Sequence, residues 1–305
     1  MFKHILVPLD GSTLAEAALP AAISLASTYK VPVTLLHIIE QDAPGEIHHD
    51  RHLTDPAEAE EYLREIARRF DIQVDTHVHT APVADVAASI VSHAADELSP
   101  ELIILTLHGR SGIRELLFGS IAQQVAAAGG IPVLLLKPVD PPAPFSLHRI
   151  LVPLDNESIH DTVLPTAQEL AKAYGAQLDL LCVIPTRDTD SGEHAAVGTL
   201  LPMTAAAYLD IAEEIAQEHF QAHVAEFEKA GIPATAQIER GDPAPVIAKT
   251  AESLGADLIL FGTHGTVGLD AFWNRSVTAA VARQTHIPLL LVPITESRKD
   301  PGGVG

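Results

Sequence analysis

The chain contains one sequence pattern twice, and this repeat limits what it can fold into more than any other feature does. Residues 4–10 read HILVPLD and residues 149–155 read RILVPLD, a shift of 145 residues. Further along, LHG at 107–109 matches THG at 263–265 with a shift of 156, so the second copy carries about 11 extra residues in its middle. We therefore predict two copies of one domain at 1–140 and 148–295, with a proline-rich linker at 141–147 and a flexible tail at 296–305.

Short apolar runs alternate with longer helical segments in both copies, which is typical of a parallel sheet covered by helices on both faces. Strands are expected near 4–9, 32–39, 72–79, 101–107 and 132–136, and then near 149–154, 177–184, 232–238, 257–262 and 288–292. Helices are expected near 13–28, 56–69, 82–97 and 119–128, and then near 158–173, 204–230, 243–254 and 276–284. The predicted fold class is α/β, with two tandem, doubly wound, five-stranded parallel-sheet domains.

Polar residues mark several of the expected helix starts. Ser12 or Thr13 and Ser158 can cap the first helix of each copy, because their side chains can accept from free N–H groups. Asp55 stands before Pro56, which combines a capping carboxylate with a proline that suits the first helical position.

The net charge of −21 narrows the classes of partner. Nucleic acids are bound through clustered Lys and Arg, and only 19 such residues are spread along the chain, so nucleic acids and anionic membranes are poor candidates.

The apolar runs are strand-length and fall short of the roughly 20 residues that cross a bilayer. The first residues already read as a strand, without room for a signal peptide, and the single cysteine, Cys182, excludes an internal disulfide framework. We expect a cytoplasmic protein.

An aspartate follows the first strand of each copy, where open parallel sheets bind their ligands. Asp10 comes after Pro8 and Leu9, and Asp155 occupies the same position in the second copy. Such a carboxylate can accept hydrogen bonds from a ribose or an adenine, or it can simply cap the following helix. Both interpretations remain open at this stage.

A glycine-containing loop follows the fourth strand of each copy. In the first copy, Gly109 and Gly119 are separated by nine residues, and Ser120 opens the next helix. In the second copy, Gly265 precedes Ser276 by a similar interval. Glycine lets the backbone approach a phosphate closely, and a helix start offers free N–H groups and a favourable dipole. The loop is therefore a candidate phosphate site.

These motifs give both copies a resemblance to universal stress protein domains, and the whole chain resembles the tandem members of that family. The resemblance rests on ILVPLDGS at 5–12, LLHI at 35–38, LHGRSG at 107–112 and Gly119-Ser120, and on LVPLD at 151–155 and GTHG at 262–265. It implies an adenine nucleotide alpha hydrolase-like sheet of order 3-2-1-4-5. One branch of the family binds ATP through the pattern G-x2-G-x9-G-[ST]. Here Thr106 replaces the first glycine in one copy, and Arg275 replaces the last glycine in the other.

The resemblance implies a nucleotide site, with the first copy as the better candidate. The implied cofactor is ATP, with AMP or ADP as alternatives, and Mg²⁺ could accompany ATP. The implied binding residues are Pro8, Asp10, Ile38, Gly109, Gly112, Gly119, Ser120 and Ile121, with second-copy counterparts Asp155, Val183, Gly262, Gly265, Ser276 and Val277.

The implied function is that of a stress-response protein acting as a nucleotide-dependent regulator. The alternatives are a nucleotide-free scaffold for protein interaction and a variant that binds a metal or small molecule. The resemblance also implies that the last strands of the two copies pair, which builds the family's dimer within one chain. A homodimer of whole chains remains open.

Histidine is abundant, with 16 residues, and the run at 48–52 (HHDRH) invites a metal hypothesis. His48 and His52 would share a face if the run were helical, and neutral imidazoles bind zinc. His77 and His79 alternate along an expected edge strand, which accounts for them as surface residues.

The chain has no recognisable hydrolytic motif, so we expect a binding protein rather than a dedicated catalyst, although slow ATP hydrolysis could accompany binding.

Overall fold

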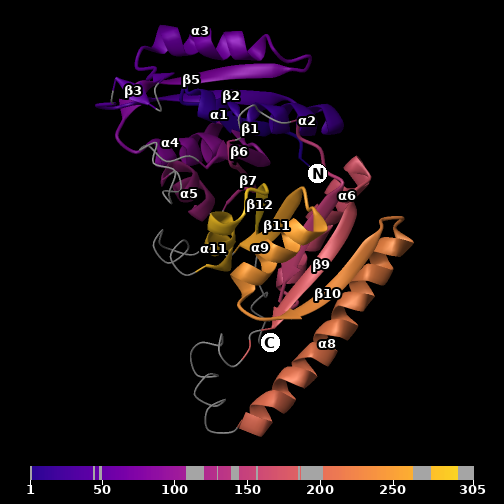
Figure 1. Ribbon diagram of the computed structural model, residues 1–305. Coiled ribbons are helices and arrows are strands. Elements are labelled where there is room, and N and C mark those ends of the chain that lie inside the picture. Colours follow the sequence, from indigo (N-terminus) through magenta and orange to yellow (C-terminus); the bar gives the residue numbers. More distant parts are fainter. Residues whose placement is uncertain are drawn as a thin grey trace, which may run out of the picture.

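The computed structural model describes residues 2–43, 45–47, 50–107, 120–128, 130–138, 144–155, 157–184, 186, 202–263 and 276–294. Within these residues the expected α/β class is confirmed (Figure 1). The strands of the first half are β1 (Ile5–Pro8), β2 (Val33–Glu40), β5 (Val74–Val83), β6 (Leu102–Thr106) and β7 (Val133–Leu136). Those of the second half are β8 (Arg149–Leu154), β9 (Gln177–Ile184), β10 (Ala234–Arg240), β11 (Leu258–Thr263) and β12 (Leu289–Pro293).

The strands form one ten-stranded sheet of order β10-β9-β8-β11-β12-β7-β6-β1-β2-β5. Each half is parallel and has the order 3-2-1-4-5, as the resemblance implied. The halves meet where β7 pairs antiparallel with β12, with Leu134 opposite Leu290. The predicted pairing of the last strands is therefore confirmed. Because this pairing is antiparallel, the carboxyl ends of the two sets of strands lie at opposite edges of the sheet.

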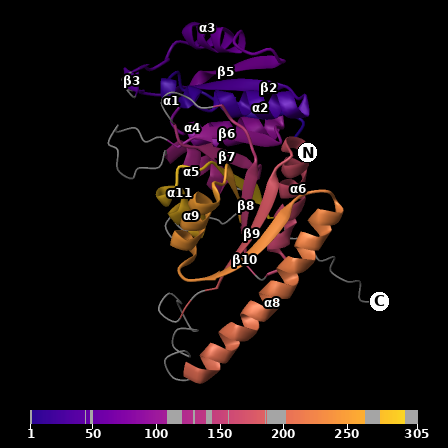
Figure 2. The same ribbon diagram turned by 45° about the vertical axis from the view of Figure 1, so that its right-hand side comes forward.

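Helices cover both faces of the sheet, as the two views in Figures 1 and 2 show. One face carries α2 (Leu19–Tyr29), α3 (Pro56–Ala67), α6 (Leu164–Tyr174) and the long α8 (Pro202–Lys229). The other carries α4 (Val86–Ser92), α5 (Ser120–Ala127), α9 (Pro243–Leu254) and α11 (Val277–Gln284). The apolar cluster on each face contains residues of both halves, so the core is continuous across the domain boundary.

The helix expected at 13–28 is interrupted, and so is its counterpart in the second half. The first half has α1 (Thr13–Glu16) before α2, and the second has the 3-10 turn η2 (His160–Val163) before α6. Pro20 and Pro165 explain both breaks, because a proline ring removes one helical N–H and clashes with the preceding turn. Ser12 caps α1 by accepting from the Ala15 N–H at 3.1 Å, whereas η2 has no side-chain cap, so the expectation for Ser158 was wrong.

The region after β5 also differs from expectation. The helix expected at 82–97 begins only at Val86, because β5 runs on to Val83 and the Asp85 side chain caps α4 through the Ala88 N–H at 2.9 Å. It then widens into the π-helical segment η1 (His93–Leu98). Residues 46–51 contain a two-stranded ladder, β3 (Glu46–Ile47) with β4 (Asp50–Arg51), which the sequence did not suggest.

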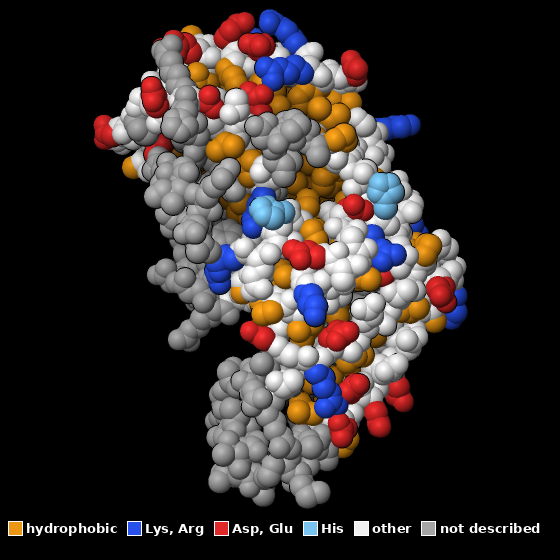
Figure 3. Space-filling view, viewed as in Figure 1, with side chains coloured by type: hydrophobic (Ala, Val, Ile, Leu, Met, Phe, Trp, Pro, Cys, Tyr) orange, Lys and Arg blue, Asp and Glu red, His pale blue; other side chains and the backbone are white. Residues whose placement is uncertain are grey.

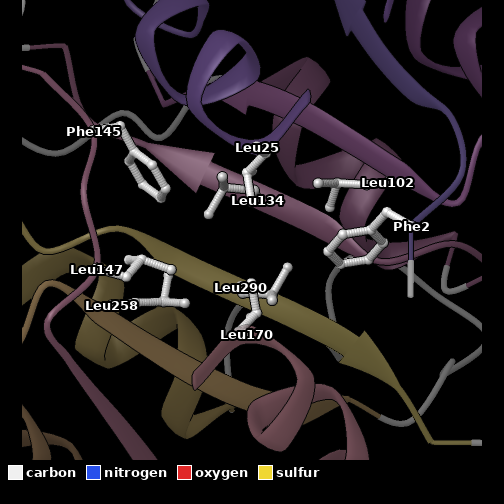
Figure 4. A pocket seen from close by; sticks show the side chains of 9 residues that line it. All are labelled: Phe2, Leu25, Leu102, Leu134, Phe145, Leu147, Leu170, Leu258 and Leu290. Atoms are coloured by element: carbon white, nitrogen blue, oxygen red, sulfur yellow. The ribbon is translucent and has the colours of Figure 1, made fainter. Parts of the chain in front are cut away.

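Equivalent residues of the two halves meet around a small apolar cavity between β7 and β12 (Figure 4). The equivalent pairs are Leu134 with Leu290, Leu102 with Leu258, Leu25 with Leu170 and Phe2 with Leu147, and Phe145 completes the lining. The cavity volume of about 10 Å³ is at the lower limit for one water molecule, and the lining offers no polar group. We interpret it as a packing gap on the local twofold axis rather than a ligand site.

No helix in the described ranges is long and apolar enough to span a membrane. On the face drawn in Figure 3, Lys and Arg side chains are scattered among acidic ones rather than gathered in one patch. The described residues on this face therefore show no basic patch. The expectation that nucleic acids are not partners stays a prediction.

Candidate functional site

Each half has a crevice where the strand order reverses. In the first half β1 pairs with β2 on one side and with β6 on the other, and in the second half β8 stands likewise between β9 and β11. Connections from the carboxyl ends of these central strands diverge to opposite faces of the sheet, which opens a binding crevice at that edge. The aspartates after β1 and β8 therefore lie where a ligand of this fold class would bind.

Asp10 shapes the turn that leaves β1. Its Oδ1 accepts from the Ser12 backbone N–H at 2.9 Å, and Ser12 in turn caps α1. Gly11 between them has φ = +91°, a backbone conformation that favours glycine, and a Cβ there would lie 2.8 Å from Leu53 Cδ1. Asp10 thus orders the turn before α1 rather than capping the helix itself, because Ser12 is the capping residue. A contact with a ligand is compatible with this role because a carboxylate accepts about four hydrogen bonds.

Residues 50–53 form a wall beside this turn. The backbone N–H and the hydroxyl of Thr13 both donate to Asp50 Oδ2, at 2.8 and 3.0 Å. The buried His37 ring bridges the turn and the wall, with Nδ1 2.8 Å from the Leu9 carbonyl oxygen and Nε2 3.0 Å from that of Leu53. The wall is thus held in place by polar contacts before any ligand arrives.

The other predicted residues of the first half occupy the surrounding strands and helix. Pro8 ends β1, and Ile38 is buried in β2. Ser120 begins α5, and Ile121 packs against the apolar cluster of that face. Gly109, Gly112 and Gly119 lie outside the described residues.

The crevice of the second half is held differently. Asp155 Oδ1 accepts from the Glu157 backbone N–H at 3.0 Å and also contacts Nδ1 of His160. Cys182 replaces His37, and its burial, with a smaller effect of Asp155, raises the pKa of the thiol to about 11. The half-buried Val183 packs against the same face as Ile38 does. A buried thiol with a raised pKa does not supply a nucleophile at neutral pH.

Gly262 has a packing role that the sequence pattern did not reveal. A Cβ at this position would lie 2.8 Å from Ile294 Cδ1 and 3.0 Å from Val163 Cγ1. The corresponding neighbours in the first half are Pro138 and Ala18, which are smaller, and Thr106 is buried there. The first half therefore has room for Thr106 where the second half needs Gly262, because its neighbouring side chains are smaller. For this reason Thr106 does not by itself argue against nucleotide binding in the first half.

The start of α11 is also defined in the second half. Ser276 caps the helix by accepting from the Ala279 backbone N–H at 3.1 Å, and Val277 is 40% exposed. Gly265, which belongs to the same predicted site, lies outside the described residues.

The histidine run at 48–52 is not helical in its described part. His52 follows β4 and is buried, with Nε2 3.9 Å from a carboxylate oxygen of Glu40. His48 lies outside the described residues, so the metal hypothesis for this pair stays a prediction. Sequence reasoning missed His37 and Asp50 as parts of the crevice wall, because their partners are 16 to 37 residues away in the chain.

The fold and the crevices define a doubly wound α/β domain that occurs twice in one chain. The sequence model of the universal stress protein family matches residues 1–137 and again residues 146–293. The chain therefore belongs to the universal stress protein family.

Two of the similar proteins span both halves of this chain, and a third matches one domain. A universal stress protein of Mycobacterium tuberculosis is 23% identical over 304 residues, covering 94% of this chain and 96% of the relative. One from Bacillus subtilis is 27% identical over 153 residues, covering 45% of this chain and the whole relative. The crystal structure of a universal stress protein from Archaeoglobus fulgidus has a TM-score of 0.70 at 20% identity, with 96% of this chain and 97% of that chain aligned. This likeness supports the tandem fold.

Proposed function

We propose that the chain is a cytoplasmic stress-response protein that binds ATP or a related adenine nucleotide in the crevice of its first half. The observation that carries this proposal is the segment that leaves β1 where the strand order reverses, because polar contacts already hold it in place. There the Asp10 turn, the Asp50–Thr13 contacts and the His37 bridge hold one wall in place. Such preorganisation lowers the ordering cost of binding.

The phosphates would be bound at the start of α5. This helix follows β6, and its first N–H groups lie at the carboxyl edge of the sheet, where a helix dipole favours an anion. The glycines of residues 109–119 would let the backbone approach the phosphates, and Mg²⁺ could accompany ATP. The acidic surface is no obstacle, because backbone amides can bind an anion without a basic patch.

The second half is the weaker candidate. Arg275 stands where the first half has Gly119, and His160, whose first-half counterpart is Ala15, contacts Asp155, so a ligand would share this carboxylate with an imidazole. We therefore expect nucleotide occupancy to alter the shape or partners of the protein through the first half.

Mass spectrometry of small molecules released from the purified protein tests the proposal. We expect an adenine nucleotide to co-purify with the wild type, and Gly119→Val to reduce its amount because the new side chain clashes at the phosphate site. Arg275→Val, at the corresponding position of the second half, is the matched control and should leave the nucleotide in place. If no nucleotide co-purifies and ATP and AMP give no calorimetric heat at millimolar concentration, the chain is a nucleotide-free scaffold instead.

A further inference from the structure

Three potential metal ligands converge beside the crevice of the second half. Asp161 belongs to η2, and His219 and His223 lie one turn apart on α8. Asp161 Oδ2 is 3.1 Å from His219 Nε2 and 3.3 Å from His223 Nε2, and the two rings meet edge to face with centroids 4.7 Å apart. The three ligand atoms lie within 4.8 Å of one another.

The packing of α8 fixes this arrangement. Ala216, Phe220 and Val224 form a buried stripe that holds the helix against the sheet. His219 and His223 flank this stripe at the same helical spacing, and so they face η2 from the edge of the core. Their side chains are 28% and 18% exposed, and that of Asp161 is 18% exposed, so the cluster lies at the edge of the core, with His223 Nε2 itself buried.

We propose that Asp161, His219 and His223 bind a divalent transition metal ion, with Zn²⁺ as the best fit. Two imidazoles and one carboxylate form a ligand set that zinc prefers. Bonds of about 2 Å to a tetrahedral zinc ion require ligand atoms roughly 3.3 Å apart. The two nitrogen–oxygen distances match this value, and water or another group would supply the fourth ligand of a tetrahedral ion.

The hydrogen bonding of His223 supports the proposal. Its Nε2 is buried and has no hydrogen-bond partner, because the carboxylate oxygen 3.3 Å away does not meet hydrogen-bond geometry. On the other side of the ring, Nδ1 lies 3.8 Å from a carboxylate oxygen of Glu226. This distance is too long for a hydrogen bond, so the support comes from the unpartnered Nε2, which faces the Asp161 carboxylate.

The first half supplies a natural comparison at the same position. Glu16 corresponds to Asp161, and its carboxylate pairs with the Arg69 guanidinium at 2.8 Å and accepts from the Tyr62 hydroxyl at 3.4 Å. Burial and the charge of Glu16 raise the pKa of Tyr62, so the hydroxyl keeps its proton. Thus the first half compensates this carboxylate with a guanidinium, whereas the second half surrounds it with two imidazoles that suit a metal cation.

A bound metal would fasten α8 to the segment that leaves β8. Asp161 adjoins His160, which contacts Asp155 in the crevice. The ion would therefore stabilise both the long helix and the turn at the second crevice.

Among the described residues a looser cluster contains His77, His93 and Glu97, with 3.9 Å between His93 Nε2 and the Glu97 carboxylate. It provides an internal control.

Metal titration of the full-length protein tests this site. Chelator-stripped protein is titrated with Zn²⁺ against a chromophoric competitor, and bound metal is counted by mass spectrometry. We expect one tight site per chain in the wild type and in His77→Ala. Loss of one ligand in His219→Ala, His223→Ala or Asp161→Asn should weaken Zn²⁺ binding by more than the roughly 10- to 100-fold that loss of an outer-shell partner costs. Circular dichroism of the metal-free variants verifies that they fold.

Cobalt gives a readout that does not depend on any variant. Co²⁺ bound to the wild type should show the intense visible absorption of tetrahedral coordination, and Zn²⁺ should displace it. The proposal is overturned if the wild type binds Zn²⁺ no more tightly than His219→Ala does, or if His77→Ala removes the tight site. An octahedral cobalt spectrum would contradict the proposed tetrahedral geometry.

Discussion

At the scale of single residues, equivalent positions in the two halves carry different interacting pairs, in which both members of the pair differ. In the first half, His4 Nε2 lies 2.8 Å from the Thr34 hydroxyl. The equivalent pair in the second half is Arg149 with Asp179, where the guanidinium Nε lies 3.4 Å from a carboxylate oxygen. Asp179 is buried and also accepts from the Thr235 hydroxyl at 2.6 Å. A buried carboxylate needs such partners, so the arginine and the aspartate depend on each other.

Replacing this pair in steps tests the dependence. Asp179→Thr alone should lower the free energy of unfolding by about 1–3 kcal/mol, because it leaves donors without their acceptor. The double variant Arg149→His with Asp179→Thr copies the first half and should recover part of the loss, which urea unfolding would measure. If the effects of Asp179→Thr alone and Arg149→His alone simply add in the double variant, the two positions are independent.

At the scale of elements, the end of β11 and the start of α6 fit together through side-chain size. Gly262 leaves space for Val163 and Ile294, while the first half combines Thr106 with Ala18 and Pro138. A glycine of the apparent nucleotide pattern is thus required for packing between a strand, a helix and the segment after β12.

Gly262→Thr should therefore destabilise the protein by about 1–3 kcal/mol through overpacking. Adding Val163→Ala and Ile294→Ala should reduce the penalty, because these changes make both neighbours smaller, as Ala18 and Pro138 are in the first half. Thermal unfolding of the single, double and triple variants would measure the coupling. A triple variant less stable than the sum of the separate effects would contradict the packing account.

The sequence predicts most elements but few of the contacts between them. The repeat and the alternation of apolar runs predict the strands, and the carboxyl-end position of Asp10 and Asp155 predicts the crevices. The helix breaks at Pro20 and Pro165 were missed, although proline chemistry explains them. The Asp161–His219–His223 cluster was missed because 58 residues separate Asp161 from His219, and only the i, i+4 histidine spacing signals it. Such contacts depend on how α8 packs, which local patterns do not specify.

At the scale of the whole molecule, the chain is an internal dimer with one continuous core. The Ser24 hydroxyl and the Tyr174 hydroxyl lie 3.0 Å apart across the boundary between α2 and α6, and β7 and β12 join the two sheets. The two crevices open at opposite edges of the sheet and have different walls. We therefore expect a single nucleotide site per chain, with the second half contributing stability and, through its histidines, a metal site.

The most direct measurement is a calorimetric titration of the full-length protein with ATP, with the wild type beside Asp10→Ala and Asp155→Ala. Both substitutions remove the equivalent turn hydrogen bond, and Asp155→Ala also removes the contact with His160, so unchanged binding in Asp155→Ala is the more demanding control. We predict one site per chain, an affinity at least about tenfold weaker in Asp10→Ala, equal to about 1.4 kcal/mol, and no change in Asp155→Ala. Absence of binding at millimolar ATP, or loss of binding in Asp155→Ala but not in Asp10→Ala, would contradict the account.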